Sequence, residues 1–147
     1  MKKLLFVILM VLNAASTKAA IFFNNLTGCD MWVSLEAHDA NGTGLCSYFS
    51  GRFLVPAGST SISFANVTNL NTTPGWVKYS NPLVPATMIS MGSGWDAATV
   101  DWDGTVQKVG NVLGCATTTT QGYSTSCGTA TLTWTVFGPG NIMVKLQ

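Results

Sequence analysis

Charged residues are scarce in this chain: they make up 9% of its 147 residues, and the formal net charge is only +1. If Lys2, Lys3 and Lys18 leave with an N-terminal leader, four basic side chains remain against six acidic ones, and the net charge falls to about −2. A protein that binds nucleic acid, or a membrane surface through charge, needs a basic patch. The composition therefore favours neither class.

The chain start also lacks an apolar run long enough to cross a bilayer. Residues 4–12 form a nine-residue apolar stretch, whereas a spanning helix needs about 20 residues. A Met-Lys-Lys start precedes this stretch and Thr17-Lys18-Ala19 follows it, a pattern typical of a bacterial secretory signal peptide cleaved after Ala19. We expect a signal peptide at 1–19 and one exported domain at 20–147, with no membrane insertion after cleavage and a secreted, periplasmic or cell-surface location.

No segment shows the 3.6-residue period of an amphipathic helix over three turns. Apolar and polar residues instead alternate, most clearly at 30–38 and 129–137, and Gly or Pro recurs every 8 to 15 residues. This pattern predicts an all-β, antiparallel β-sandwich of about seven to nine strands. The expected strands lie at 21–24, 31–38, 52–55, 60–65, 76–80, 87–91 and 105–109, followed by a hairpin of 129–137 and 142–147, with longer loops at 66–75 and 92–104.

The sequence has no CxxC pair and a single histidine, His38, so it offers little for a zinc site. An even number of cysteines in an exported chain predicts two disulfides. The four cysteines allow three connectivities, and we favour the one that pairs cysteines close in sequence. Each of its two bonds would stabilise the fold by about 3 kcal/mol on the chain-entropy model. These pairings are Cys29 with Cys46 and Cys115 with Cys127.

A catalytic triad is not expected, because no GxSxG nucleophile motif accompanies His38. The candidate ligand-binding residues instead lie in the expected loop at 92–104, where tryptophan stands beside aspartate. Tryptophan can stack on a sugar ring and a carboxylate can accept its hydroxyls, but the same residues also suit an ordinary loop, a weak calcium site or a glycosidase carboxylate pair. These candidates are Trp95, Asp96, Asp101, Trp102 and Asp103.

Two further tryptophans differ in the face on which they lie. Trp134 alternates with threonines and belongs to the expected core. Trp32 shares its strand face with Asp30, Ser34 and Glu36, which predicts an outward ring on a polar sheet surface. An outward tryptophan is a candidate contact residue; the alternative is that Trp32 packs under a loop or against a second layer.

The segment FNNLTGCDMWVSLEA, at 23–37, resembles the start of thaumatin-like and similar small secreted β-sandwiches, in which a strand, an Asn-rich turn and a cysteine lead into a Trp/Val strand. The resemblance implies a β-sandwich architecture. Thaumatin-like proteins carry many more cysteines and an acidic cleft without counterpart in this sequence. No functional residue is therefore carried over.

The leading functional hypothesis is a secreted, non-enzymatic β-sandwich protein that acts at or outside the cell surface through its loops and sheet faces. The alternative is a carbohydrate-binding module or lectin that uses the Trp/Asp loop, and the third hypothesis is a small glycoside hydrolase. Assembly through an exposed terminal strand is a further option. We expect no cofactor and no metal, and the candidate partners are a glycan or a surface protein.

Overall fold

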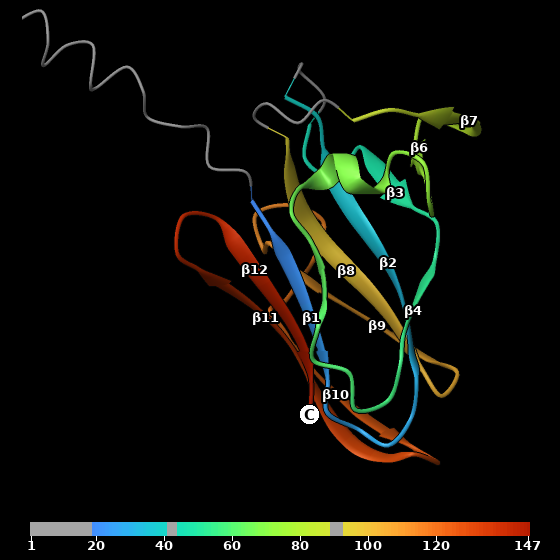
Figure 1. The fold of residues 1–147 in the computed structure, drawn as a ribbon, viewed down its shortest axis with the longest axis vertical. Helices are drawn as coiled ribbons and strands as arrows, with labels where there is room; N and C mark the ends of the chain where they lie inside the picture. The colour runs from blue at the N-terminus through green and yellow to red at the C-terminus, as the bar shows by residue number, and fades with distance from the viewer. Residues whose placement is uncertain (1–18, 41–43, 89–92) are drawn as a thin grey trace, which may run out of the picture.

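The computed structural model describes residues 19–40, 44–88 and 93–147, and these residues form an all-β fold of two stacked sheets (Figure 1). In spatial order, the five-stranded sheet consists of β10 (Thr120–Thr125), β11 (Gly128–Phe137), β12 (Asn141–Leu146), β1 (Ile21–Asn25) and β5 (Ile62–Phe64). The seven-stranded sheet runs through β7 (Asn81–Ala86), β6 (Trp76–Lys78), β3 (Tyr48–Ser50), β2 (Met31–His38), β8 (Gly94–Trp102) and β9 (Thr105–Gly110), and β4 (Phe53–Val55) also pairs with β2.

The predicted fold class is confirmed, with two differences in detail. The described residues form twelve strands rather than seven to nine, because several of the strands span only three residues. The pairing is antiparallel except between β1 and β12, which run parallel. A short 3-10 helix, η1 (Val67–Leu70), lies within the expected loop at 66–75.

The alternation seen in the sequence accounts for the core between the sheets. Every second residue of β2 from Met31 to Ala37 is fully buried, and the buried residues of β11, including Trp134, face the core from the other sheet. Trp134 therefore lies in the core, as predicted. The expected C-terminal hairpin is also confirmed, since β11 pairs with β12 across a turn in which Gly138 and Gly140 have positive φ angles.

The loop prediction for 92–104 is wrong, because Gly94–Trp102 forms β8, which pairs with both β2 and β9. The two-residue turn between β8 and β9 consists of Asp103 and Gly104, both with positive φ. An Asp-Gly pair is the preferred sequence for such a turn, because both central residues must adopt the left-handed conformation.

The remaining differences concern strands that were missed or misplaced. β3, β7 and β10 were not predicted, because their segments lack a clear alternation of apolar and polar residues. The strand expected at 87–91 is absent at Thr87 and Met88, and the rest of that segment lies outside the described residues, as does most of the signal peptide expected at 1–19.

All four cysteines form disulfides, but the favoured local pairing is wrong. Cys29 pairs with Cys127 and Cys46 pairs with Cys115. The first bond joins the β1–β2 connection to the turn between β10 and β11, and therefore links the two sheets at one end of the sandwich. The strands carry residues that are distant in sequence to the same end of the fold, and sequence proximity alone could not reveal this.

Candidate functional site

Three of the five residues predicted to contact a ligand are buried in β8. Trp95 is 5% exposed, and Asp96 and Trp102 are each 1% exposed. The Trp102 ring packs edge-on against Tyr123 in the core. Neither tryptophan therefore presents a ring face on which a sugar could stack.

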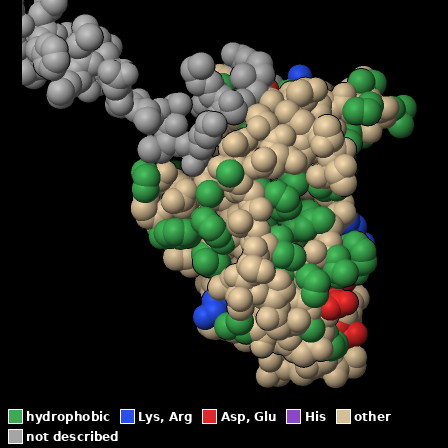
Figure 2. Space-filling view, viewed as in Figure 1, with side chains coloured by type: hydrophobic (Ala, Val, Ile, Leu, Met, Phe, Trp, Pro, Cys, Tyr) green, Lys and Arg blue, Asp and Glu red, His purple; other side chains and the backbone are tan. Residues whose placement is uncertain are grey.

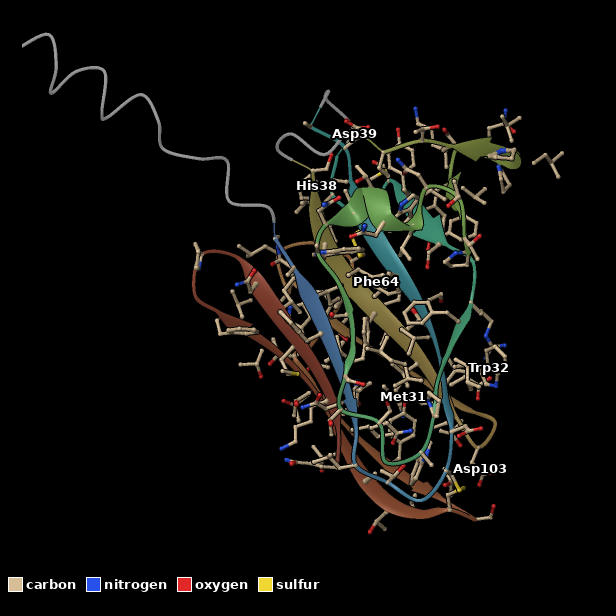
Figure 3. All side chains as sticks on the ribbon, in the orientation of Figure 1. Met31, Trp32, His38, Asp39, Phe64 and Asp103 are labelled. Carbon is tan, nitrogen blue, oxygen red and sulfur yellow. A yellow bond between two sulfur atoms is a disulfide. The ribbon has the colours of Figure 1, made fainter. Side chains whose placement is uncertain are left out.

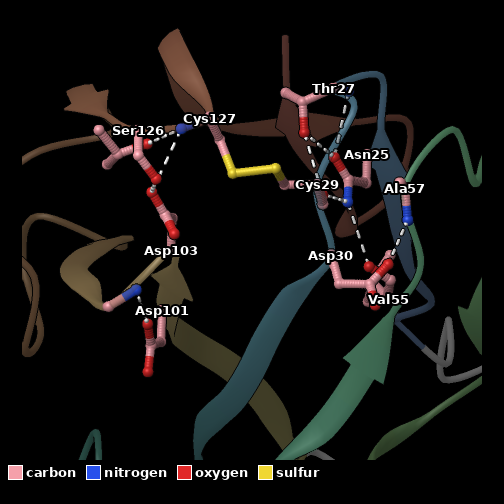
Figure 4. The surroundings of a disulfide bond; sticks show 12 residues. Asn25, Thr27, Cys29, Asp30, Val55, Ala57, Asp101, Asp103, Ser126 and Cys127 are labelled. Carbon is pink, nitrogen blue, oxygen red and sulfur yellow. Dashed lines mark hydrogen bonds between the residues drawn. A yellow bond between two sulfur atoms is a disulfide. The ribbon is translucent and has the colours of Figure 1, made fainter.

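The other two predicted residues bind different partners near the end of β8 (Figure 4). Asp101 accepts a hydrogen bond from the Gly104 backbone N–H and forms an ion pair with Arg52. Asp103 accepts hydrogen bonds from the Ser126 hydroxyl and the Cys127 backbone N–H, and these hydrogen bonds lower the pKa of Asp103. The bond from Ser126 is the largest cause of this shift.

These carboxylates do not form a glycosidase pair. Asp96 and Asp101 are five residues apart on β8, a separation of roughly 16 Å in an extended strand, whereas glycosidase carboxylates lie about 5 to 10 Å apart. Asp101 and Asp103 are closer, but one binds Arg52 and the other binds Ser126. The arrangement thus gives no support to the hydrolase hypothesis at these three residues.

Trp32 lies outward, as predicted. Its side chain projects from β2 away from the body of the protein, whereas the adjacent Met31 points into the core (Figure 3). Trp32 is 46% exposed, and the other four tryptophans are at most 5% exposed. It is therefore the one tryptophan in the described residues that offers a ring to a ligand.

Strand pairing places other side chains beside Trp32 on the outer face of the seven-stranded sheet. Directly opposite Trp32 are Leu54 on β4 and Asp101 on β8, and Asp101 in turn pairs with Val106 on β9. These four side chains form a row across the sheet. The neighbouring row contains Ser34, Thr99 and Lys108, and we refer to the two rows together with Arg52 as the Trp32 face.

A hollow of about 230 Å³ lies on this face. The Arg52 guanidinium lies 6.0 Å from the centroid of the Trp32 ring and also forms the ion pair with Asp101. The hollow therefore combines an aromatic ring with fixed charges of both signs and with hydroxyl groups. Its lining residues are Trp32, Ser34, Arg52, Thr99, Asp101 and Val106.

The same outer face continues to a buried polar cluster at the other end of β2. Glu36, which is 4% exposed, forms an ion pair with Lys108 and lies within 4.8 Å of both sulfur atoms of the Cys46–Cys115 disulfide. The pKa of Tyr79 is raised, mainly by burial and further by the negative charge of Glu36 and a hydrogen bond with it. Because both sulfurs are already in a disulfide, this cluster does not offer thiolates to a metal.

His38 and Asp96 form a second polar contact at this end of the sheet. Nδ1 of His38 lies 2.7 Å from Oδ1 of Asp96, and Oδ2 of Asp96 accepts a hydrogen bond of 2.7 Å from the Cys46 backbone N–H. Burial raises the pKa of Asp96, although both hydrogen bonds oppose the shift. Asp96 thus joins β8, the end of β2 and the Cys46 loop, which indicates a structural role.

A second hollow, of about 410 Å³, lies where the two sheets meet near Ala19, and Trp95 and Trp134 contribute to its lining. Only 5% of each of these tryptophans is exposed, and none of the described residues that line the hollow is charged. It lacks the aromatic platform and the fixed charges of the Trp32 face. We therefore take the Trp32 face as the candidate site.

From the sequence, Trp32 and Asp101 were identified separately but not as neighbours, and Arg52 was given no role. The Asp103-Gly104 pair is typical of a hairpin turn and could have indicated that Trp32 and Asp101 share a sheet. A hairpin at that point sets β8 beside β9 and places Asp101 on a sheet face. The contact with Arg52 follows from the pairing of β4 with β2, which no local pattern predicts.

The described residues contain no helix that is long and apolar enough to cross a membrane. Comparison with protein-family models, curated proteins and solved structures finds no match to this chain. The candidate function therefore rests on the geometry of the site.

Proposed function

We propose that this chain is an exported, non-catalytic binding protein and that its Trp32 face holds a saccharide. Export is supported by the leader-like sequence at 1–19 and by the two disulfides, which are compatible with an oxidising, extracellular environment. Because Trp95 and Trp102 are buried, we propose a site on the sheet face rather than in the Trp/Asp loop first expected.

The observation that carries the proposal is the single exposed tryptophan beside the Arg52–Asp101 ion pair. One face of a pyranose ring is rich in C–H groups and packs on an indole ring, while its hydroxyls need both donors and acceptors at the ring edge. Arg52 supplies donors, Asp101 supplies acceptors, and the hydroxyls of Ser34 and Thr99 supply both.

The charge balance of the face favours a neutral sugar over an anionic one. Arg52 is paired with Asp101 and Lys108 is paired with Glu36. An anionic sugar would compete with these carboxylates for the cations. A neutral saccharide can accept hydrogen bonds from Arg52 and donate to Asp101 while the ion pair remains in place.

A glycan array followed by isothermal titration calorimetry tests the proposal, with Trp32→Ala compared against Phe137→Ala. Phe137 is a matched control because it is 41% exposed but lies on the other sheet. We expect Trp32→Ala to lose about tenfold or more in affinity, which corresponds to about 1.4 kcal/mol, and Phe137→Ala to bind normally. Absence of saccharide binding, or equal binding by both variants, would refute the proposal.

A further inference from the structure

A second surface, separate from the hollow beside Trp32, is a cluster of exposed apolar side chains on β7. Leu83 is 91% exposed and Val84 is 54% exposed, and Pro82 and Pro85 on either side of them are also exposed. Apolar atoms project from the upper right corner of the molecule, over β7 (Figure 2). We refer to residues 82–85 as the apolar bulge.

The register between β6 and β7 explains why this segment projects. Lys78 pairs with Asn81, and the adjacent Val77 pairs with Pro85, so residues 82–84 have no partners on β6. Pro82 and Pro85 also lack the backbone N–H that a regular ladder would use. The three extra residues therefore bulge from the sheet and carry Leu83 and Val84 with them.

Aromatic contacts lie at the base of the apolar bulge, where β6 leads into β7. The Tyr79 ring, 52% exposed, lies 4.7 Å from the Phe49 ring, and Nζ of Lys78 lies 5.8 Å from the centroid of Tyr48. Tyrosine and lysine are residues that place an apolar stem in an apolar medium and a polar end in water. An aliphatic tip above a Tyr/Lys base is the arrangement expected at a lipid–water boundary.

Charge and size distinguish between the possible occupants of this surface. Residues 79–95 contain no Asp, Glu, Lys, Arg or His, and the Glu36 carboxylate beside Tyr79 is already buried and paired with Lys108. Entry of residues 82–85 into an apolar phase therefore desolvates no further ionised group. A stable protein–protein interface buries about 1,200 to 2,000 Å², which a convex tip of four residues cannot provide. A lipid surface sets no such minimum area.

We propose that the apolar bulge inserts into the interfacial layer of a phospholipid bilayer, with Leu83 and Val84 among the acyl chains and Tyr79 and Lys78 at the headgroup level. The insertion is shallow and reversible and does not span the bilayer. The sequence-based expectation of no membrane insertion rested on the short leader segment and the scarcity of basic residues, and this apolar contact depends on neither. The proposal is independent of saccharide binding.

Sedimentation of the exported chain with phosphatidylcholine vesicles tests this proposal. We expect measurable partitioning that Leu83→Ser/Val84→Ser lowers at least about tenfold, because most of the inserted apolar area is lost. Leu113→Ser is the matched control, since Leu113 is 86% exposed but lies outside the bulge, and it should partition like the parent chain. Equal losses in the double variant and the control, or no partitioning of the parent, would overturn the proposal.

Insertion depth provides a second readout that does not depend on the amount bound. In Leu83→Trp, acyl-brominated phosphatidylcholine should quench the new indole, while the indole of Leu113→Trp should show no more quenching than the parent chain. Absence of extra quenching in Leu83→Trp overturns the proposal. Analytical ultracentrifugation completes the test, because self-association that Leu83→Ser/Val84→Ser abolishes would identify a second copy as the occupant and would also overturn it.

Discussion

Two aspartates on and beside β8 show how local environment sets the chemistry of one residue type. Asp96 is 1% exposed, and its burial raises its pKa above the ordinary value of 3.8. Asp103 lies in an exposed turn, where hydrogen bonds led by that of Ser126 lower its pKa below the same value. The two residues are therefore expected to affect folding stability with opposite dependence on pH.

The prediction at this scale compares Asp96→Asn with Asp103→Asn by urea unfolding across pH. A folded pKa above the unfolded one means that Asp96 contributes stability below about pH 4, and that this contribution is lost as pH rises through the folded pKa. The lowered pKa of Asp103 means that its contribution is present above about pH 4 and is lost as pH falls through the folded pKa.

The free energy of unfolding of the parent, taken relative to Asp96→Asn, should thus fall as pH rises above about 4. The same quantity relative to Asp103→Asn should rise as pH increases through the acidic range up to about 4. If the free energy of unfolding relative to each variant changed with pH in the same direction, the opposite pKa shifts of Asp96 and Asp103 would be contradicted.

At the scale of single elements, the pairing of β8 with β9 depends on a close backbone approach at Gly110. A Cβ atom placed there would lie 2.5 Å from the Asp96 carbonyl oxygen and 2.6 Å from Cα of Ala97. Both are backbone atoms of β8 and cannot move independently of the strand. The close packing of β9 against β8 therefore requires glycine at position 110, at this end of the sheet that carries the Trp32 face.

Gly110→Ala should lower the free energy of unfolding by about 1–3 kcal/mol, the usual cost of overpacking. Gly122→Ala on β10 is the control, because a Cβ there meets no atom within 4 Å. The measurement is thermal or urea unfolding of both variants. Equal stability of the two would contradict the β8–β9 register.

The strands that could be predicted from sequence are those with one dry face and one wet face. In β2 and β11, alternation predicted both the strands and the outward position of Trp32 and the inward position of Trp134. β8 was missed because its sequence does not alternate cleanly: Trp95, Asp96, Ala97 and Ala98 are all buried, and the pairing with β2 shifts register beside them. The periodicity of such a segment resembles neither a strand nor a helix.

Only part of the candidate site could be predicted, because the order of the strands in the sheet determines which side chains lie beside Trp32. Trp32 was recognised from its own strand, but its neighbours Arg52 and Asp101 come from β4 and β8 regions that are distant in sequence. Asp101 was singled out for its tryptophan neighbour Trp102, which is in fact buried. Alternation reveals the face of a side chain but not which strand lies beside it.

At the scale of the whole molecule, the two disulfides close long loops. Cys29 and Cys127 are 98 residues apart, and Cys46 and Cys115 are 69 residues apart. Local pairing appeared favourable because each favoured pair is close in sequence and brackets a polar, turn-rich insert. In the folded protein, however, the strand order brings the distant cysteines together.

Removal of either disulfide by paired Cys→Ser substitution should lower the free energy of unfolding by about 3–4 kcal/mol on the chain-entropy model, because the two loops are nested and the remaining bond already constrains the unfolded chain. The local pairing would predict a similar loss of about 3 kcal/mol for each bond, so the connectivity needs its own measurement. Peptide mapping of the unreduced protein provides the direct check. Peptides that join Cys29 to Cys46, or Cys115 to Cys127, would contradict the observed connectivity.

The central functional claim is that a saccharide binds at the Trp32 face, and indole NMR tests it most directly. Each of the five tryptophans gives one Nε1–H signal, and single Trp→Phe variants assign them. On titration with the best saccharide from the array, we expect the Trp32 signal to shift in proportion to occupancy while the four buried indoles stay unchanged. A shift confined to Trp95 or Trp102, with Trp32 unmoved, would contradict it.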